Sequence, residues 1–516
     1  MQQAWLNYSQ TFKQLDVDEW LNQLKQYSFM PRFGTSTYQQ LNFQTQTPSW
    51  FNLALANPLV ELSIFSLSGI GFLAVMFTPF VKNHKRLKYA LALAFVCFIV
   101  FGVGFFTGQI YAQSGSHNIY LDVLPSTASY VIETDGTYVW ATRYDGYLAY
   151  GGSTNRGGVS GTDASAVIQA AINALGTVGG KIFIKAGVYN LSSPIGWAVT
   201  ADTNAAIDII GEGASTILQQ YPTRTTPLIQ IKTTSGNIRR IRIANLHLKG
   251  GTKGIELQNA AYNIFENLYF IGQSQWGIDD LTNSVINKFS RIMMVHMDGG
   301  GIRLRGPWNM IEQCNFGEDI KGNAVQLESN YNIVANSFFR PNSDVVGVYL
   351  TGSFNIIIGN TVYDCLRGVS LYSNGNVVAF NNIYNTKREG IAVWHFTAGS
   401  FYADNRIIGN AIWNTGLDPA WTEKNGITLN RAQRTIVAFN RIFDVPSYSI
   451  RETALAENDY NDISYNIVAQ SIYKYGLNTK VKGNVGYYAE NFKATGVSVP
   501  IGTGGVYGSA VAITSP

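Results

Sequence analysis

A short unit recurs from residue 253 onward and constrains the fold more than any other feature of this chain of 516 residues. The unit is a glycine or another small residue, an aliphatic residue, any residue, and usually a second aliphatic residue. Successive units begin 21 to 24 residues apart, except for one interval of 36 residues. The units begin at Gly254 (GIEL), Gly277 (GIDD), Gly301 (GIRL), Ala324 (AVQL), Gly347 (GVYL), Gly368 (GVSL), Gly390 (GIAV), Gly426 (GITL), Ser449 (SIRE) and Ser471 (SIYK).

A second motif runs between these units and contains one inner asparagine per repeat. Two short strands with alternating apolar residues and one turn asparagine, in about 22 residues, describe one coil of a parallel β-solenoid. A leucine-rich repeat is the main alternative at this period, but its LxxLxL pattern and its helix are missing. The long interval between Gly390 and Gly426 predicts a loop that protrudes from the wall. The inner asparagines are Asn336, Asn360, Asn382, Asn410, Asn440 and Asn466.

The stretch 161–175 (GTDASAVIQAAINAL) predicts a helix that caps the first coil, with Thr162 or Asp163 as its N-cap. The sequences GGKIFIKAGVY and IIGEG follow it. This order resembles the capped start of the pectin-lyase-like superfamily, which includes pectate lyases, polygalacturonases and virus tailspikes. The resemblance covers about residues 160–490 and implies an all-β fold, a right-handed parallel β-helix. It does not imply one activity, because enzymes, adhesins and structural proteins share this start.

The balance of charge argues against a nucleic-acid partner. The formal net charge is +4, and residues 1–111 hold seven basic and four acidic side chains, so the remainder is nearly neutral. Binding to nucleic acid needs a basic face that neutralises phosphates. The three cysteines, Cys97, Cys314 and Cys365, have neither the number nor the spacing of a disulfide framework or a zinc site. Two separately buried thiols are favoured over a bridge between Cys314 and Cys365.

Two apolar runs, 59–81 and 89–111, are long enough to cross a membrane as a pair of α-helices. The basic loop 82–88 between them is expected on the cytoplasmic side, which places both ends of the chain outside. The predicted organisation is an extracytoplasmic segment with amphipathic helices (1–57), a transmembrane hairpin in contact with membrane lipid (58–111), a linker with a β-hairpin (112–160), the β-helix (161–490) and a tail (491–516). A partner subunit, or a second copy of the chain, is expected to contact the N-terminal helices and the hairpin.

The repeat also predicts which side chains face solvent. If the aliphatic residues point inward, the third and fifth residues of each unit point outward and stack along the axis. This face suits an extended glycan, because charged groups bind hydroxyl or uronate groups and aromatic rings stack on sugars. The alternative is an ordinary solvated face. The candidate substrate-binding residues are Glu256, Arg305, Glu328, Tyr349, Tyr372 and Trp394.

The unit GIDD is unusual because Asp280 replaces an inward aliphatic residue. A buried carboxylate is costly unless it is paired, so it marks either a functional site or a cap on a local bend. The pair Asp279 and Asp280 resembles the adjacent aspartates of polygalacturonases, which implies hydrolysis. The NTD, SHG and RIK motifs of that family are missing in order, however. The candidate catalytic residues are Asp279, Asp280 and Arg303.

A similarity to pectate lyases would imply other roles for the same face. Arg303 or Arg305 would then be the base, and calcium would be the cofactor. Two functions therefore stay open. The chain is either a membrane-anchored β-helix that binds polysaccharide, and cleaves it if it is a lyase or hydrolase, or a structural or adhesive surface protein without enzymatic activity. Under the lyase hypothesis the calcium ligands would be Glu256, Asp279 and Glu328.

Overall fold

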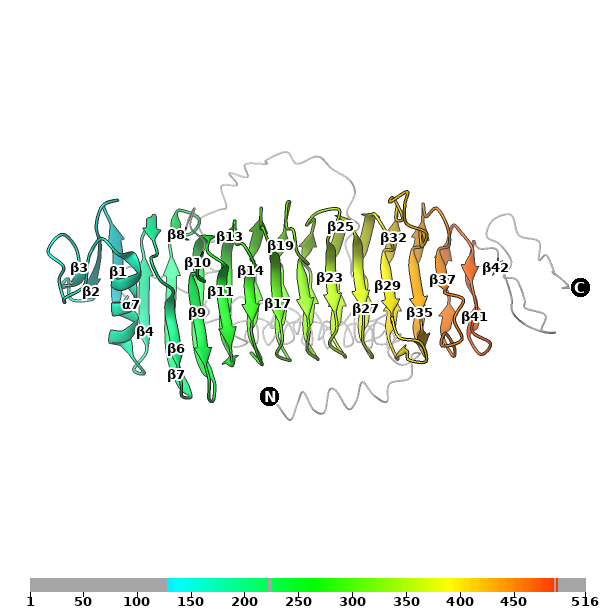
Figure 1. The fold of residues 1–516 in the computed structure, drawn as a ribbon, viewed down its shortest axis with the longest axis horizontal. Helices are drawn as coiled ribbons and strands as arrows, with labels where there is room; N and C mark the ends of the chain where they lie inside the picture. Colours follow the sequence, from blue (N-terminus) through cyan, green and yellow to red (C-terminus); the bar gives the residue numbers. More distant parts are fainter. Residues whose placement is uncertain (1–127, 221–224, 487–488, 491–516) are drawn as a thin grey trace, which may run out of the picture. The chain divides into compact units, whose positions relative to one another are not determined.

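The computed structural model describes residues 128–220, 225–486 and 489–490, which wind into the elongated solenoid of Figure 1. The predicted N-terminal segment (1–57), the transmembrane hairpin (58–111) and the tail (491–516) lie outside the described residues. Among the described residues, no helix combines the length and the hydrophobicity that a membrane crossing needs.

Each repeat unit predicted from the sequence forms a strand of one parallel sheet, which we call sheet B. In the described part of the chain this sheet has 13 strands, and aligned aliphatic residues of successive strands point into the core. The prediction of a parallel β-helix is therefore confirmed. The strands of sheet B are β6 (Ile195–Val199), β9 (Ile229–Thr233), β11 (Lys253–Gln258), β14 (Trp276–Asp280), β17 (Gly300–Leu304), β20 (Val325–Leu327), β23 (Val346–Leu350), β26 (Arg367–Leu371), β29 (Ile391–Trp394), β33 (Ile427–Asn430), β37 (Ile450–Glu452), β40 (Ile472–Tyr473) and β42 (Ala489–Glu490).

The rest of the wall is sheet A, which bends once per coil and so has two flanks. Strands β10 (Ile238–Gly250) and β13 (Ile264–Ile271) run through the bend and belong to both flanks. The first flank also contains β4 (Gly180–Ile184), β7 (Thr203–Gly211), β12 (Ala260–Ala261), β15 (Lys288–Ser290), β18 (Met310–Glu312), β21 (Ile333–Ala335), β24 (Ile356–Ile358), β27 (Val377–Ala379), β31 (Arg406–Ile408), β35 (Ile436–Ala438), β38 (Asp462–Ser464) and β41 (Lys480–Lys482). The second flank contains β5 (Gly187–Asn190), β8 (Thr216–Gln220), β16 (Met293–Val295), β19 (Asn315–Phe316), β22 (Phe338–Phe339), β25 (Thr361–Cys365), β28 (Asn382–Thr386), β32 (Ala411–Trp413), β36 (Arg441–Phe443) and β39 (Ile467–Val468).

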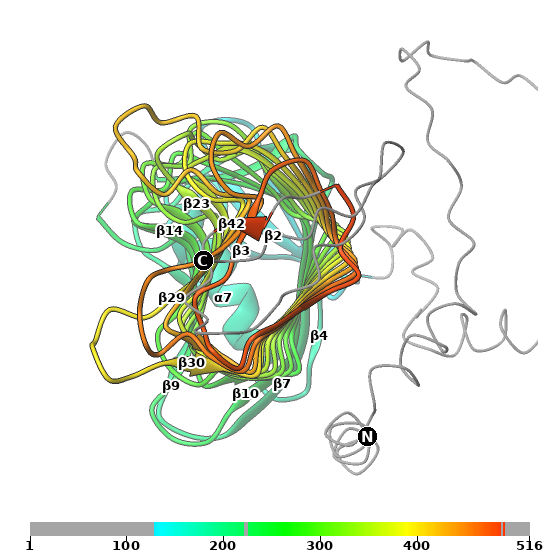
Figure 2. The ribbon, with the colours of Figure 1, turned by 90° about the vertical axis from the view of Figure 1, so that its right-hand side faces the viewer.

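The N-terminal end of the solenoid is closed by helix α7 (Ala164–Leu175), which Figure 2 shows at the far end in a view along the axis. Asp163 is the N-cap, and its side chain accepts a hydrogen bond of 3.0 Å from the backbone of Ser165. The residues of its apolar face are all buried, namely Val167, Ile168, Ala171, Ile172 and Leu175. In place of the β-hairpin predicted within the linker 112–160, the structure has a three-stranded antiparallel meander of β1 (Tyr130–Thr134), β2 (Val139–Arg143) and β3 (Leu148–Gly151).

Two columns of stacked asparagines hold successive coils in register, one before each strand of the first flank and one at the bend. Asn360 is typical: its amide nitrogen donates to Asn381 of the next coil (3.0 Å) and to the backbone oxygen of Val334 (3.0 Å). Of the predicted inner asparagines, Asn360, Asn410, Asn440 and Asn466 lie in the column at the bend. Two predictions were wrong by one residue, since Ser337 replaces Asn336 and Asn381 replaces Asn382. A shift of one residue matters because Asn336 is the bend residue itself, with φ 50°.

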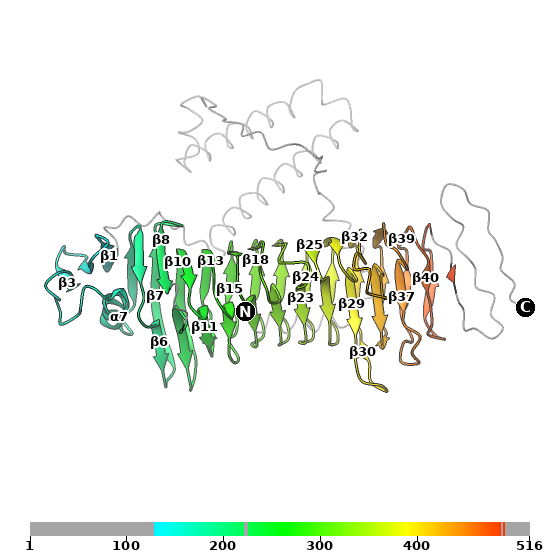
Figure 3. The ribbon, with the colours of Figure 1, turned by 45° about the horizontal axis from the view of Figure 1, so that its top comes forward.

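The long interval of the repeat forms two protruding loops rather than one. The first joins β29 to β31, and it carries the short strand β30 (Tyr402–Ala403), which pairs with β34 (Ala432–Gln433). Figure 3 shows this loop reaching beyond the neighbouring coils. The second joins β32 to β33 and contains Trp421. The two loops flank the outer face of sheet B, which makes this coil different from the others.

The core is a continuous column of aliphatic and aromatic side chains along the axis. Phe265 stacks on Phe289 with ring centroids 5.1 Å apart, and Phe316 stacks on Phe339 at 4.8 Å. Cys314 and Cys365 are free and buried, as predicted, and burial raises the pKa of the Cys314 thiol to about 12. These two thiols are therefore part of the packing rather than nucleophiles.

Candidate functional site

The aromatic residues predicted to bind substrate lie together on the outer face of sheet B. The rings of Tyr349 and Tyr372 are 4.9 Å apart and tilted by 35°, and Tyr372 stacks on Phe396 at 5.6 Å. Phe396 belongs to the first loop and is 72% exposed. Trp394 lies 6.5 Å from Phe396, with the planes tilted by 52°. We call Tyr349, Tyr372, Trp394, Phe396 and Trp421 the aromatic cluster.

Trp421 reaches this cluster from the second loop and is held there by a buried carboxylate. Its ring lies 6.5 Å from Trp394, and its indole nitrogen donates to Glu389 at 3.2 Å. Glu389 is fully buried and also accepts a hydrogen bond of 2.6 Å from Arg367. The guanidinium of Arg388 lies over the Trp421 ring, 3.8 Å from its centroid. The position of Trp421 is therefore fixed by charged groups of the preceding coil.

Several buried polar atoms around the aromatic cluster have no hydrogen-bond partner within the described residues. They include the hydroxyl of Ser370, the side-chain oxygen of Asn430 and the Nε of Arg388. Ser370 is paired in the sheet with Tyr349, and Asn430 with Trp394, so both project from the outer face beside an aromatic ring. A buried polar atom without a partner is costly, and a bound ligand or an ordered water is a common reason for one. These atoms point to a polar ligand on this face.

The charged residues of the same face form a closed network at the other end of sheet B. Asp279 is fully buried, accepts two hydrogen bonds from Arg303 (2.7 and 3.0 Å), and lies 2.9 Å from Lys253. Lys253 and Lys232 both bind Glu256. Burial opposes ionisation of Asp279, but the hydrogen bonds from Arg303 and Lys253 outweigh it and lower its pKa. The ring of Trp276 covers Arg303 at 4.8 Å.

The remaining candidates at this end are also paired. Arg305 donates to Glu328 at 2.8 Å, and the same carboxylate accepts a hydrogen bond of 2.7 Å from Gln326. The structure therefore brings Glu256, Asp279 and Arg303 together in one group and Arg305 and Glu328 in the next. In both groups the cations already neutralise the carboxylates.

Asp280 points to the opposite side of strand β14, into the core, as its place in the repeat predicts. Its carboxylate accepts hydrogen bonds from the backbone nitrogens of Arg305 (2.9 Å), Gly306 (2.7 Å) and Ser284. Burial raises the pKa of this carboxyl group. Glu452 has the same place in its repeat and binds the backbone nitrogens of Tyr475 and Gly476. The recurrence favours a role for Asp280 in holding the turn of the next coil, and catalysis by Asp279, Asp280 and Arg303 stays a prediction.

A calcium site on the predicted carboxylates does not fit these contacts. Glu256, Asp279 and Glu328 are each bound by a lysine or an arginine of the chain. Calcium ligands need oxygen atoms that are free to turn toward the ion. In the part of the chain that the structure describes, no group of three or more His, Cys, Asp or Glu side chains is arranged to hold a metal ion.

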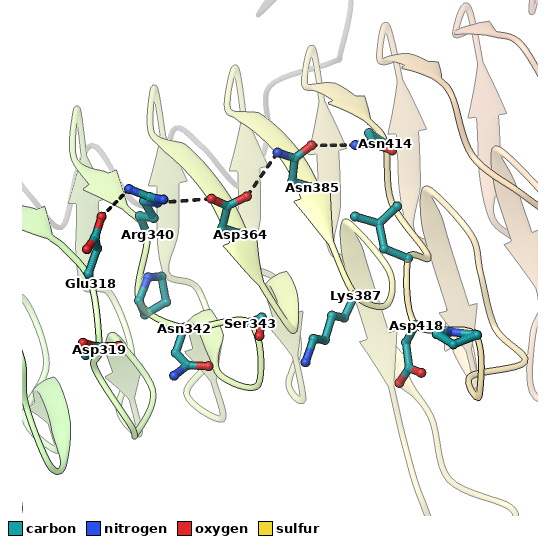
Figure 4. A pocket seen from close by; sticks show the side chains of 13 residues that line it. Glu318, Asp319, Arg340, Asn342, Ser343, Asp364, Asn385, Lys387, Asn414 and Asp418 are labelled. Atoms are coloured by element: carbon teal, nitrogen blue, oxygen red, sulfur yellow. Dashed lines mark hydrogen bonds and ion pairs between the residues drawn. The ribbon is translucent and has the colours of Figure 1, made fainter.

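A separate shallow pocket of about 790 Å³ lies beside the second flank of sheet A. A chain of hydrogen bonds crosses it from Glu318 through Arg340, Asp364 and Asn385 to Asn414, as Figure 4 shows. These side chains satisfy one another, whereas buried polar atoms beside the aromatic cluster have no partner among the described residues. The aromatic cluster is therefore the better candidate site.

Sequence reasoning identified three residues of the aromatic cluster and missed the other two, Phe396 and Trp421, together with the Arg367–Glu389 pair beneath Trp421. The repeat predicts the direction of side chains within strands, but it does not predict where a loop residue lies. The signal available was the insertion itself, since Trp421 lies in the extra residues between Gly390 and Gly426.

Comparisons with known proteins agree on the fold. Residues 227–412 match the model of the right-handed β-helix region. The A-module of mannuronan C-5 epimerase AlgE6 from Azotobacter vinelandii is similar in structure, with a TM-score of 0.54 and 17% identity over 64% of this chain and 96% of that module. The A-module of AlgE4 from the same organism gives a TM-score of 0.50 and 18% identity over 62% of this chain and 96% of the module.

No curated protein matches the sequence. At these identities the two likenesses show a common fold, and the activity of this chain has to be argued from its own residues. Three observations indicate the same fold: the coils with their two columns of asparagines, the capping helix, and the match to the β-helix family model. The described part of the chain is a right-handed parallel β-helix domain.

Proposed function

We propose that the chain binds a polysaccharide along the outer face of sheet B, across strands β23, β26, β29 and β33. The observation that carries the proposal is the aromatic cluster together with the unpartnered atoms of Ser370 and Asn430. Tilted rings leave part of each face open to the apolar side of a sugar, and the polar atoms can bind its hydroxyls. The two similar Azotobacter modules act on mannuronan by name, which makes polysaccharides the first class to test.

Three features favour binding at this end over the charged end. The aromatic cluster lies between two loops, its rings are only partly covered, and its polar atoms include groups without a partner. The charged end has no such groups, because its carboxylates are bound by Lys232, Lys253, Arg303 and Arg305. A ligand at the charged end would have to displace these internal ion pairs.

The location of the protein is also part of the proposal. The apolar runs 59–81 and 89–111, with the basic loop 82–88, support a membrane anchor that holds the β-helix on the extracytoplasmic side. The alternative function is a structural or adhesive surface protein in which the solenoid is a spacer. The two functions differ in one respect that can be measured, namely whether the aromatic cluster binds a free glycan.

The test is binding of the full-length chain to a panel of immobilised polysaccharides, followed by titration with the best ligand. Trp394→Ala is expected to lower the affinity at least about tenfold, or about 1.4 kcal/mol, since a stacking ring is lost. Tyr384→Ala removes a ring of the second flank that stacks on Tyr363 at 4.8 Å and is the matched control. Absence of binding by the folded wild type would favour the structural alternative.

Cleavage is measured on the same samples by the release of new chain ends. If the chain is a lyase or hydrolase of the predicted kind, Asp279→Asn and Arg303→Gln abolish cleavage while binding at Trp394 persists. Binding without cleavage by the wild type would leave a binder, and the proposed site would stand unchanged.

A further inference from the structure

One cation beside the aromatic cluster lacks the carboxylate partner that its neighbour has. Two guanidinium groups lie over the ring of Trp421, that of Arg388 at 3.8 Å and that of Arg367 at 5.4 Å from the ring centroid. Arg367 is buried and donates a hydrogen bond of 2.6 Å to the buried carboxylate of Glu389. Arg388 forms no ion pair with any described residue, and its buried Nε has no hydrogen-bond partner among these residues. The two arginines therefore share one aromatic ring, but only one of them is neutralised.

The carboxylates around the aromatic cluster do not neutralise Arg388. Three of them each bind a different arginine, and Arg388 is not one of these arginines. Asp418 of the second loop accepts a hydrogen bond of 2.9 Å from the backbone of Ala420 and lines the pocket of Figure 4. This end of sheet B therefore carries an excess of positive charge within the described residues. The three pairs are Glu389 with Arg367, Glu423 with Arg451, and Glu457 with Arg431.

The backbone of Arg388 is held in place by three hydrogen bonds. Its nitrogen donates to the oxygen of Leu366 (2.8 Å), and its oxygen accepts from the hydroxyl of Thr386 (2.7 Å) and from the nitrogen of Gly416 (2.9 Å). Gly416 belongs to the second loop, so the segment that carries Arg388 and the loop that carries Trp421 are bound to each other. A side chain that is already ordered loses little conformational entropy when it binds a ligand. A guanidinium that lies over a ring also keeps N–H donors at its edge, where two of them can bind one anion.

We propose that the polysaccharide bound by the aromatic cluster is acidic, and that Arg388 binds its carboxylate or sulfate groups while the aromatic rings stack on its sugars. This inference rests on the proposed function and adds the chemical class of the ligand. A neutral glycan would leave Arg388 without a counter-charge, whereas an anionic group forms a charge-assisted, bidentate pair with it. At the charged end of sheet B the cations already bind carboxylates of the chain, so an anion there has to compete with them.

Matched pairs of polymers test the charge requirement with the full-length chain. The probes are mannuronan and polygalacturonate, each compared with its own carboxyl-reduced, neutral form, and dextran sulfate, compared with dextran. The acidic polymer that binds best is expected to bind at least about tenfold more tightly than its neutral form, which corresponds to about 1.4 kcal/mol. Its affinity should fall as the salt concentration increases, because salt screens the charge of Arg388. The sulfated pair shows whether the bound anion is a sulfate or a carboxylate.

Arg388→Gln separates binding of the anion from support of Trp421. If Arg388 binds the anion, this variant lowers the affinity for the acidic polymer about tenfold, leaves the affinity for the neutral form unchanged and removes most of the salt dependence. If Arg388 only supports Trp421, the affinities for both forms fall equally. Arg388→Lys keeps the charge and should bind the acidic polymer more tightly than Arg388→Gln. Arg441→Gln is the matched control, because Arg441 is an exposed cation of the second flank that forms no ion pair with a described residue.

The outcomes distinguish this inference from the proposed function. Equal affinities for an acidic polymer and its neutral form would overturn the acidic class of ligand, and the binding site would stand if Trp394→Ala still weakens binding. Losses of equal size for both forms in Arg388→Gln would overturn the role of Arg388 in binding the anion. Absence of binding to every polymer by the folded wild type would overturn the proposed function and this inference with it. A circular dichroism spectrum of each variant checks that it is folded.

Discussion

The two halves of the outer face of sheet B differ in how their polar groups are satisfied. At the charged end, from β9 to β20, lysine and arginine side chains neutralise the carboxylates, and Asp279 is fully buried beneath them. At the aromatic end, from β23 to β33, rings are tilted and Ser370 and Asn430 keep polar atoms without partners. In the first half the polar side chains satisfy one another, as they do in a structural part of the fold. The second half has polar atoms that are available to bind a ligand.

This difference shows why charge alone is a poor guide to a site on a solenoid. Stacked coils place residues of equal position about 4.8 Å apart, so opposite charges on neighbouring coils pair with one another before they can serve a ligand. Aromatic rings in the same positions can also satisfy each other, as Tyr363, Tyr384 and Trp413 do by parallel stacking. Unpartnered polar atoms, rather than residue type, distinguish the proposed site from such a ladder.

The largest expected effect concerns Asp280. Asp280→Ala leaves the backbone nitrogens of Ser284, Arg305 and Gly306 without their acceptor, so we expect the free energy of unfolding to fall by about 3 kcal/mol. Urea denaturation measures it. The exposed Glu318→Ala, which breaks a surface ion pair, should cost less than about 1 kcal/mol. Unchanged stability of Asp280→Ala together with lost cleavage would instead make Asp280 catalytic.

Glu389→Gln tests whether Trp421 is positioned by the carboxylate beneath it. The change removes the charge that binds Arg367, so unfolding free energy is expected to fall by about 2 kcal/mol, and affinity for the polysaccharide should fall several-fold. Titration of the ligand separates the two effects, because Trp421→Ala should lower affinity with a smaller loss of stability. Full affinity in Glu389→Gln would mean that Trp421 needs no such support.

Because of Asp279, the free energy of unfolding is expected to depend on pH. Its pKa lies below the ordinary value, so its ionised form stabilises the fold above about pH 4, and this contribution is lost as the pH falls through the folded-state pKa. Asp279→Asn should therefore cost on the order of 1–2 kcal/mol at neutral pH, and the difference from wild type should shrink below about pH 4. Denaturation curves between neutral and acidic pH provide the measurement. A difference that is constant with pH would contradict the ion pairs.

The smallest expected effect is that of Ser370→Ala. Because its hydroxyl has no partner, removal should leave the unfolding free energy within about 0.5 kcal/mol of wild type. If the hydroxyl binds the ligand, affinity should fall about threefold to tenfold, as for one hydrogen bond. Thr361→Ala on the second flank is the control for a lost hydroxyl away from the site. Equal affinities of Ser370→Ala and wild type would remove Ser370 from the proposed contacts.

The sequence was sufficient for the direction of side chains within strands. The position of each GIxL unit predicted the inward Ile278 and Asp280 and the outward Tyr349, Tyr372 and Trp394. It was insufficient wherever a neighbour came from another coil or loop, as for the backbone partners of Asp280 and for Glu389 beneath Trp421. Those contacts depend on how loops return to the wall, and spacing does not encode that path. The membrane hairpin stays a prediction, since residues 58–111 lie outside the described part.

The stacking of coils also determines where local unfolding of the solenoid begins. Each coil contacts little beyond its two neighbours, so the solenoid is a linear lattice that frays from its ends. At the N-terminal end α7 covers the first coil, and the longest described strand, β10 with 13 residues, lies in the coils close to it. Amide exchange should therefore advance as a front from the last coils inward. The aromatic cluster lies behind several coils that such a front must cross first.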